Sequence, residues 1–278
     1  MFGAVFCESF FLGVLVTVSA MASDSETSMK TPEGTTATAM RAAVAPSQAE
    51  TWKLVRTAND DLYSSLKSFI CDEQIARYRG RFNGDSPREV DAIAAKLSFE
   101  NGIEHYTDIW QKGKHRTSLS SLMGAWSQGE FGTLLLQTEK LLETQAVDFR
   151  EYSEVNGRLV AVYTFGVEEQ ESPWDLEVSG RHYRVPFKTQ VSVARDSGQI
   201  VRIARTSENL PVEMRISAIE WGVTLAPVEL GGQKYLLPRL GEYMVLYQQS
   251  DRRDWNVMNF SNYHRYDVQV SLRFDAVN

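Results

Sequence analysis

The sequence predicts an α+β fold: one large, curved antiparallel β-sheet, a half-barrel of about ten strands, with two amphipathic helices packed on its concave face. Apolar and polar residues alternate along many short segments, most clearly over residues 267–274. Turns that contain glycine, such as Asn156-Gly157, separate these segments, and two other stretches have helical spacing instead. A side-chain period of two gives each strand one apolar face, which the sheet covers by curling around the helices.

The first 22 residues have the features of a secretory signal. Residues 10–20 form an apolar run that is too short to span a bilayer comfortably, and Ala20-Met21-Ala22 supplies a small-x-small cleavage site. No Lys or Arg precedes the run, which leaves a misplaced start codon or an uncleaved anchor open. We therefore expect a periplasmic or secreted protein, cleaved near Ala22, with no stable membrane span after cleavage.

Residues 23–46 are rich in Ser, Thr and Ala and predict a flexible linker. No second linker divides the remainder, so we expect residues 47–278 to form a single half-barrel domain. A helix is predicted from Ser47-Gln48-Ala49-Glu50, which has the capping-box form, to about residue 68. Its apolar residues recur at helical spacing: Trp52, Val55, Leu62 and Leu66.

Three strands are expected after this helix. The first covers residues 69–82 and ends at the turn signal Asn83-Gly84-Asp85-Ser86-Pro87. The second, around residues 93–99, and the third, residues 103–111, flank Asn101-Gly102. This pair predicts a β-hairpin, because both of its residues tolerate positive φ.

Residues 112–146 interrupt the β pattern. Ser127-Gln128-Gly129-Glu130 repeats the capping-box form, and apolar residues at helical spacing follow, so we expect a second helix of about three turns here. From residue 147 a meander of about seven strands runs almost to the C-terminus, with prolines near strand ends where a missing donor is tolerated.

Charge and cysteine content narrow the choice of partners. The net charge of −7 gives no general attraction to nucleic acid or to anionic lipid, and we expect no nucleic-acid partner. Cleavage of the leader would leave Cys71 as the only cysteine, so no internal disulfide can form. Cys71 is either a small apolar residue on a strand or a thiol for an intermolecular disulfide or another reaction.

In element order and export signal, the sequence resembles the periplasmic lipoprotein-carrier fold of LolA and LolB, and the resemblance covers about residues 47–275. Residues 124–131 and Leu236-Leu237-Pro238 also look like those of uncharacterised secreted bacterial proteins of this shape. The resemblance implies an eleven-strand half-barrel that closes over helices and carries acyl chains in the cavity between them. No motif of the family is matched residue by residue, so the resemblance assigns no functional residue to this chain.

The side chains best suited to line such a cavity are large apolar residues of the strands and of the second helix: Phe131, Leu135, Phe165, Val191, Val193, Trp221 and Val223. An acyl chain held there gains roughly 0.8 kcal/mol for each buried methylene. The same side chains can instead interdigitate and leave no void, as protein interiors normally do.

The sequence contains no motif for catalysis, metal binding or a cofactor. The histidines form no H-x-H or H-E-x-x-H arrangement, and Asp196-Ser197-Gly198 lacks the G-x-S-x-G elbow. We therefore expect no metal, no cofactor and no enzymatic activity. A hydrolase site assembled only in the fold stays open, and its sign would be a titratable pair, such as His182 with a carboxylate, in a cleft.

These observations favour an exported envelope protein that binds or carries a lipid or a lipoprotein acyl chain between sheet and helices. The alternative is a non-catalytic module with a closed core, whose surface aromatics contact an envelope protein partner. Trp126, Trp174 and Trp255 lie in or beside predicted loops, where they either plug the barrel ends or form such a patch.

Overall fold

The computed structural model describes residues 52–59, 66, 69–81, 86–122, 125–208 and 210–265. All of them belong to one compact unit, Val44–Asn278. The expected leader, the linker, the first capping box at residues 47–50 and the alternating segment 267–274 lie outside the described residues. Their assignments therefore stay predictions.

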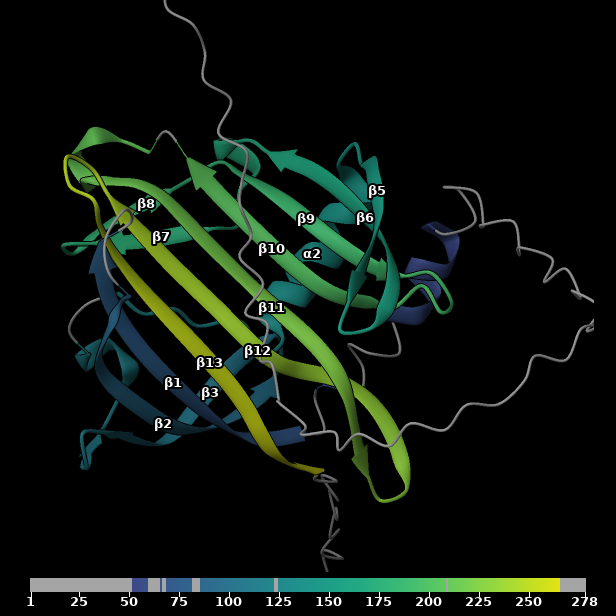
Figure 1. The fold of residues 1–278 in the computed structure, drawn as a ribbon, viewed down its shortest axis with the longest axis horizontal. Helices are drawn as coiled ribbons and strands as arrows, with labels where there is room; N and C mark the ends of the chain where they lie inside the picture. Colours follow the sequence, from purple (N-terminus) through teal and green to yellow (C-terminus); the bar gives the residue numbers. More distant parts are fainter. Residues whose placement is uncertain are drawn as a thin grey trace, which may run out of the picture. The chain divides into compact units, whose positions relative to one another are not determined.

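Eleven of the described strands form one antiparallel sheet that does not close into a barrel (Figure 1). In order across the sheet they are β4 (Lys114–Arg116), β3 (Ile103–Gln111), β2 (Arg88–Glu100), β1 (Phe69–Arg81), β13 (Arg252–Arg265), β12 (Gln233–Tyr247), β11 (Ile216–Leu230), β10 (Ile200–Glu208), β9 (Phe187–Ala194), β6 (Arg158–Val167) and β5 (Asp148–Val155). The predicted α+β fold with a large curved antiparallel sheet is confirmed, and its architecture is the one that the resemblance to LolA and LolB implies.

Pairing between the first and last described strands places β1 and β13 inside the sheet. They pair from Phe69↔Arg265 to Arg81↔Arg252. The edges of the sheet are therefore β4 and β5, which follow one another in the sequence. The segment between them, with the 3-10 turn η1 (Leu119–Ser121) and the helix α2 (Thr133–Thr144), must cross from one edge to the other.

The contacts of this crossing segment show that the sheet is strongly curved. Glu104 on β3 accepts a hydrogen bond from the N–H of Gly132, and Arg205 on β10 donates to Gln137. β3 and β10 are six positions apart in the sheet, which is about 29 Å if the sheet is flat. The helix rises only about 8 Å between the two contact points. The sheet therefore curls around α2, as Figure 1 shows.

The second half of the sheet departs from a simple meander in one place. After β6 and the 3-10 turn η2 (Glu169–Glu171), the chain forms a separate hairpin of β7 (Asp175–Val178) and β8 (Arg181–Arg184). It then returns as β9, which pairs with β6. A last 3-10 turn, η3 (Val212–Met214), lies between β10 and β11. The period-two pattern does not reveal which strands pair, so it did not separate this hairpin from the main sheet.

Residues 52–59 are helical, in agreement with the first predicted helix, and they pack on the turn between β9 and β10. The amide nitrogen of Asn59 donates to the carbonyl of Gly198 at 3.3 Å, and its carbonyl oxygen accepts from the N–H of Ile200 at 3.2 Å. The ring of Trp52 lies 5.3 Å from that of Tyr163. Both contacts fix this helical segment to the β9–β10 half of the sheet.

The apolar core is one cluster that includes strands from both halves of the sheet and α2. Cys71 on β1 is fully buried within it, as a small apolar residue on a strand would be, and burial raises the pKa of its thiol. Within the described ranges, no helix has the length and apolarity that crossing a bilayer requires.

We expect Gly198→Ala to destabilise the protein more than Gly157→Ala does. Both glycines have positive φ, 72° and 77°, so each alanine introduces about 1 kcal/mol of backbone strain. A Cβ on Gly198 would also lie 2.5 Å from the backbone carbon of Leu54, whereas one on Gly157 meets nothing within 4 Å. Urea denaturation should show a further loss of about 1–3 kcal/mol for Gly198→Ala. Equal losses would contradict the packing of residues 52–59 on this turn.

Candidate functional site

The helix α2 presents one apolar stripe to the concave face of the sheet. Its buried residues recur three and four positions apart: Leu134, Leu135, Thr138, Leu141 and Leu142. The helix begins at Thr133, slightly later than the capping-box pattern predicts, and Gly132 is its N-cap. A Cβ on Gly132 would lie 2.8 Å from the ring of Phe99, so glycine permits the close approach of the helix start to β2.

A carboxylate from the sheet, that of Glu104 on β3, caps the N-terminus of α2. Its Oε1 accepts hydrogen bonds from the N–H groups of Phe131 and Gly132, both at 2.9 Å, and its Oε2 accepts from Gly129 at 2.8 Å. The phenol of Tyr106 donates to the same carboxylate at 2.7 Å. Helix N-termini expose unpaired N–H groups and carry partial positive charge. One carboxylate therefore accepts hydrogen bonds from these groups and also offsets the charge.

The residues of the expected capping box point into the core instead of closing on the helix. Glu130 is 1% exposed and accepts hydrogen bonds from the hydroxyl of Ser127 and from the indole N–H of Trp221. Burial, followed by the charge of Glu104, raises the pKa of Glu130 to about 7. Burial and neighbouring carboxyl groups also raise the pKa of Glu73 on β1 well above its usual range. Among the described residues, one oxygen each of Glu73 and Glu130 has no hydrogen-bond partner.

Arg205 on β10 connects the middle of α2 to the sheet. Its guanidinium is fully buried and donates to the side-chain oxygens of Gln137 at 2.7 Å and Thr138 at 3.2 Å. It also lies 4.7 Å from the centre of the Phe187 ring. No carboxylate of the described ranges forms an ion pair with Arg205, and burial lowers its pKa to about 9. The cation is therefore held by neutral groups, which bind it less strongly than a carboxylate does.

The seven residues predicted to line a cavity are all buried and belong to the core. Five of them lie on β6, β9 and β11: Phe165, Val191, Val193, Trp221 and Val223. β10 runs between β9 and β11, with Ile203 opposite Val191 and Val223, and Arg205 opposite Trp221. Arg205 therefore stands within a patch that the sequence indicated as apolar. Leu135 faces the sheet from α2. The role of all seven residues as ligand contacts stays a prediction.

Phe131 lies away from these five residues, toward the other half of the sheet. Its ring is stacked on that of Tyr263 at 6.1 Å and is 6.2 Å from that of Phe260, both on β13. It is also 6.4 Å from the ring of Phe99 on β2. The residues predicted to line one cavity therefore lie in two regions, one at β6, β9 and β11 and the other beside β13 and β2, and α2 connects the two.

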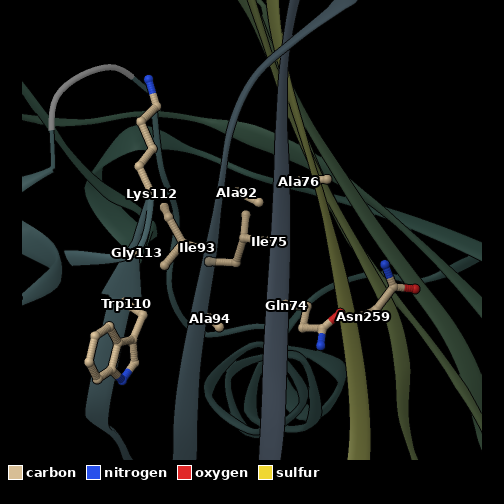
Figure 2. A pocket seen from close by; sticks show the side chains of 10 residues that line it. All are labelled: Gln74, Ile75, Ala76, Ala92, Ile93, Ala94, Trp110, Lys112, Gly113 and Asn259. Carbon is tan, nitrogen blue, oxygen red and sulfur yellow. The ribbon is translucent and has the colours of Figure 1, made fainter. Parts of the chain in front are cut away.

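One hollow of about 390 Å³ lies on the outward face of the sheet, where small side chains of β1 and β2 meet β3 (Figure 2). Ala76, Ala92 and Ala94 line it, and Trp110 and Lys112 stand at its side. Trp110 is 45% exposed. A second hollow of about 430 Å³ lies beside β12 and β13. None of the seven predicted residues lines either hollow.

The described residues contain no group of three His, Cys, Asp or Glu side chains that could hold a metal ion. The sign expected of a hydrolase site is a pair of His182 with a carboxylate, and His182 does have such a partner. Its Nδ1 lies 2.7 Å from Oδ2 of Asp175, and this hydrogen bond raises the pKa of His182. Both side chains are on the exposed β7–β8 hairpin and line neither hollow. The pair is a surface ion pair rather than a catalytic pair in a cleft.

Of the loop tryptophans, Trp174 is buried and packs on Trp221 and Phe187, both at 5.6 Å. It therefore closes the core on that side. Trp255 is instead part of β13 and lies 5.6 Å from Tyr78 of the neighbouring β1.

Sequence reasoning missed Glu73, Glu104 and Arg205, although part of the signal was present. Glu73 shares the buried phase of β1 with Cys71 and Ile75. Arg205 likewise follows Ile203 in the buried phase of β10. A charged residue in the apolar phase of a strand indicates a buried partner, and such positions are candidate functional residues.

Comparisons with known proteins found distant structural neighbours. No family model matches the chain, and no curated protein matches its sequence. A DUF1329 family protein from Desulfovibrio piger is 11% identical with a TM-score of 0.34, over 80% of this chain and 93% of that one. A putative outer membrane lipoprotein-sorting protein domain from Vibrio parahaemolyticus is 12% identical with a TM-score of 0.39, over 79% and 95%.

A LolA superfamily protein from Nitrosomonas europaea is 10% identical to this chain, with a TM-score of 0.33. The match covers 79% of this chain and 94% of that one. At these values the likenesses are distant, and none assigns a role to a residue of this chain.

Glu104→Gln should destabilise the protein by about 1–3 kcal/mol, because an amide carries no charge and turns an NH2 group toward backbone N–H donors. Glu154→Gln on the exposed strand β5 is the matched control, with an expected change within about 0.5 kcal/mol. Urea denaturation of both variants measures the difference. Equal stabilities would show that the cap contributes nothing.

The titration of Glu130 should lower the free energy of unfolding as the pH rises from about 5 to about 7. Its pKa is about 7 in the folded protein against a usual 4.5, so the folded state binds more protons between these values. The stability from this group is full below the unfolded pKa and is lost as the pH rises through the folded pKa.

Glu130→Gln removes this titration and leaves every other ionisable group in place. The unfolding free energy of the variant, measured in urea at pH 5, 6, 7 and 8, should therefore fall less steeply than that of the natural protein. Parallel profiles for the two proteins would rule out Glu130 as the source.

Proposed function

We propose that this protein is a non-catalytic carrier of the cell envelope, which holds the hydrocarbon chain of a lipid or lipoprotein between α2 and its sheet. The observation that carries the proposal is the position of α2 on the concave face of an open sheet. The described hydrogen bonds between this helix and the sheet use side chains of the sheet, those of Glu104 and Arg205, and not the backbone of a strand. A helix held in this way can shift without breaking any pairing between strands.

The space that α2 occupies suits a hydrocarbon chain. Its buried side is mostly leucine. On the sheet, Ile203 shares the buried phase of β10 with Arg205, which contacts α2, and Val191 and Val223 lie opposite Ile203. An acyl chain that entered here would replace the leucine side chains of α2 in their contacts with the sheet. At roughly 0.8 kcal/mol per methylene, a chain of about 16 carbons supplies on the order of 10 kcal/mol toward displacing the helix.

The two polar attachments of α2 differ in strength. Glu104 is a charged acceptor for several N–H groups at the N-terminus, whereas Arg205 binds neutral oxygens of Gln137 and Thr138. Both attachments are charge-assisted, and the one at Glu104 consists of more hydrogen bonds, so it is the harder to break. We therefore propose that α2 pivots about its N-terminus while its middle moves away from Arg205.

The proposed location outside the cytoplasm rests on the leader. The apolar run of residues 10–20 and the cleavage site Ala20-Met21-Ala22 support export, after which residues 23–46 would tether or precede the carrier domain.

Native mass spectrometry of the protein expressed with its leader in a Gram-negative host tests the carrier function. We expect lipid or acylated species bound at one per chain, and stoichiometric uptake of an apolar fluorescent dye by protein from which lipid has been removed. An empty protein that takes up neither dye nor lipid would refute the proposal.

Gln137→Leu should speed dye uptake several-fold without changing the number of sites, because it removes an acceptor that Arg205 uses to hold α2. Stopped-flow fluorescence measures the rate. Gln145→Ala at the end of the same helix removes only an exposed hydrogen bond to Glu171 and serves as the control. Unchanged uptake in Gln137→Leu would count against movement of the helix away from Arg205.

The alternative, an interaction module with a closed core, has one observation in its favour. The exposed indole of Trp110 stands beside an outward hollow whose lining includes Ala76, Ala92 and Ala94. Exposed aromatic residues at such hollows are enriched in protein interfaces. If this alternative holds, the natural protein takes up no dye, and Trp110→Ala abolishes its association with envelope proteins.

A further inference from the structure

Three carboxyl groups from separate parts of the chain meet at the start of α2. Glu73 lies on β1, Glu104 on β3, and Glu130 two residues before Gly132, the N-cap of the helix. Glu73 and Glu130 are each 1% exposed. The charges of Glu130 and Glu104 both act on Glu73, and the charge of Glu104 acts on Glu130. These three residues are called the acid cluster below.

The side chains that surround the acid cluster carry no positive charge. They come from five strands: Cys71 of β1, Tyr106 of β3, Trp221 of β11, Tyr243 of β12 and Tyr263 of β13. The arginines beyond them have other partners. Arg239 acts on Tyr263 and donates to the carbonyl of Phe260 at 3.2 Å, and Arg205 lies behind the ring of Trp221 and donates to α2. Within the described ranges, no lysine or arginine forms an ion pair with the cluster.

Hydrogen bonding in the acid cluster suits one charged and two protonated carboxyl groups. Glu104 accepts from the N–H groups at the helix start and from Tyr106, which together hold its charge. Glu130 uses only Oε1, which accepts from Ser127 and Trp221. Among the described residues, Oε2 of Glu130 and Oε2 of Glu73 have no partner. A buried oxygen without a donor is far less costly on a neutral carboxyl group than on a carboxylate.

Loss of the proton from Glu130 places a second negative charge beside Glu104. Because the pKa of Glu130 is about 7, this happens near neutral pH. Two like charges repel more strongly in the interior than on the surface. The strands around Glu130 are fixed by backbone pairing, whereas the start of α2 is held to the sheet by the side chain of Glu104. The helix start is therefore the part that can move to admit water to the new charge.

Trp221 connects the acid cluster to the second attachment of α2. Its indole N–H donates to Glu130, and its ring lies 5.7 Å from the guanidinium of Arg205. Arg205 in turn donates to Gln137 in the middle of the helix. Both polar attachments of α2, at Glu104 and at Arg205, thus adjoin a group that acts on Glu130 or contacts it.

We infer that the acid cluster is a proton-controlled switch. While Glu73 and Glu130 carry protons, α2 stays on the sheet, and the charging of Glu130 loosens the start of the helix and opens the path for a ligand. The effect on ligand uptake rests on the proposed carrier function, whereas the movement of α2 can be measured without a ligand.

Hydrogen exchange of the amides of α2 at pH 6 and pH 8 tests the movement, with each rate divided by that of a free peptide at the same pH. If opening returns Glu130 from a pKa of about 7 to its usual 4.5, the open population is about tenfold larger at pH 8 than at pH 6. The protection of α2 should therefore fall about tenfold. The protection of β9, which is paired on both sides, should change much less.

Three variants locate the titrating group. Glu130→Gln cannot lose a proton, so α2 should be equally protected at both pH values. Ser127→Ala removes a hydrogen bond that favours the charged form of Glu130, so the loss of protection should move to higher pH. His182→Gln removes an exposed titratable group of β8 and is the control, which should keep the pH dependence of the natural protein.

Stopped-flow uptake of the apolar dye at pH 6 and pH 8 tests the consequence for a ligand. We expect uptake to be several-fold faster at pH 8 in the natural protein and in His182→Gln, and equally fast at both pH values in Glu130→Gln.

Equal protection of α2 at both pH values in the natural protein would overturn the switch. A loss of protection that survives in Glu130→Gln would overturn it as well. Dye uptake at one rate at both pH values would overturn the switch and leave the carrier function standing. A helix that loses protection at pH 8 in a protein that takes up no dye would support the switch and overturn the carrier function.

Discussion

The pairing of β1 with β13 is the constraint on which the architecture depends. It joins the beginning and the end of the sheet, so the two free edges, β4 and β5, are consecutive in the sequence. A connection between opposite edges of a curved sheet has to pass over one of its faces. Here it passes over the concave face, where an amphipathic helix can bury its apolar stripe. The interior position of α2 follows from strand order as much as from its own sequence.

This arrangement places several ionisable side chains in the interior. Glu104 is bound to the start of α2, Glu130 to Trp221 of β11, and Arg205 to the middle of the helix. Buried charges are favourable only when they are fully paired. The buried pair Arg77–Asp91, with bonds of 2.6 and 2.7 Å, meets that requirement. Glu73, Glu130 and Arg205 meet it less well, because one buried side-chain atom of each has no hydrogen-bond partner among the described residues.

Much of the fold and only part of the site could be predicted from the sequence. The hairpin at Asn101-Gly102 and the helix near residue 133 are local, because turn geometry and apolar spacing specify them within a few residues. The same local signal predicted that the seven apolar residues proposed to line a cavity lie in the core, and their contact with a ligand stays a prediction. The contacts of Glu104 were not predictable, because its partners Phe131 and Gly132 are more than twenty residues away and lie outside its strand.

By itself, the sequence determined the two-residue period of strands such as β1 and β2, the apolar stripe of α2 and the acidic balance of the chain, since these depend on neighbouring residues alone. Only the tertiary structure decided that β13 returns to β1, that Arg205 stands inside an apolar patch, and that Glu73 and Glu130 meet beside the start of α2. Each of these is a contact between residues far apart in the chain. Such contacts are selected by the free energy of the whole fold, which no local pattern contains.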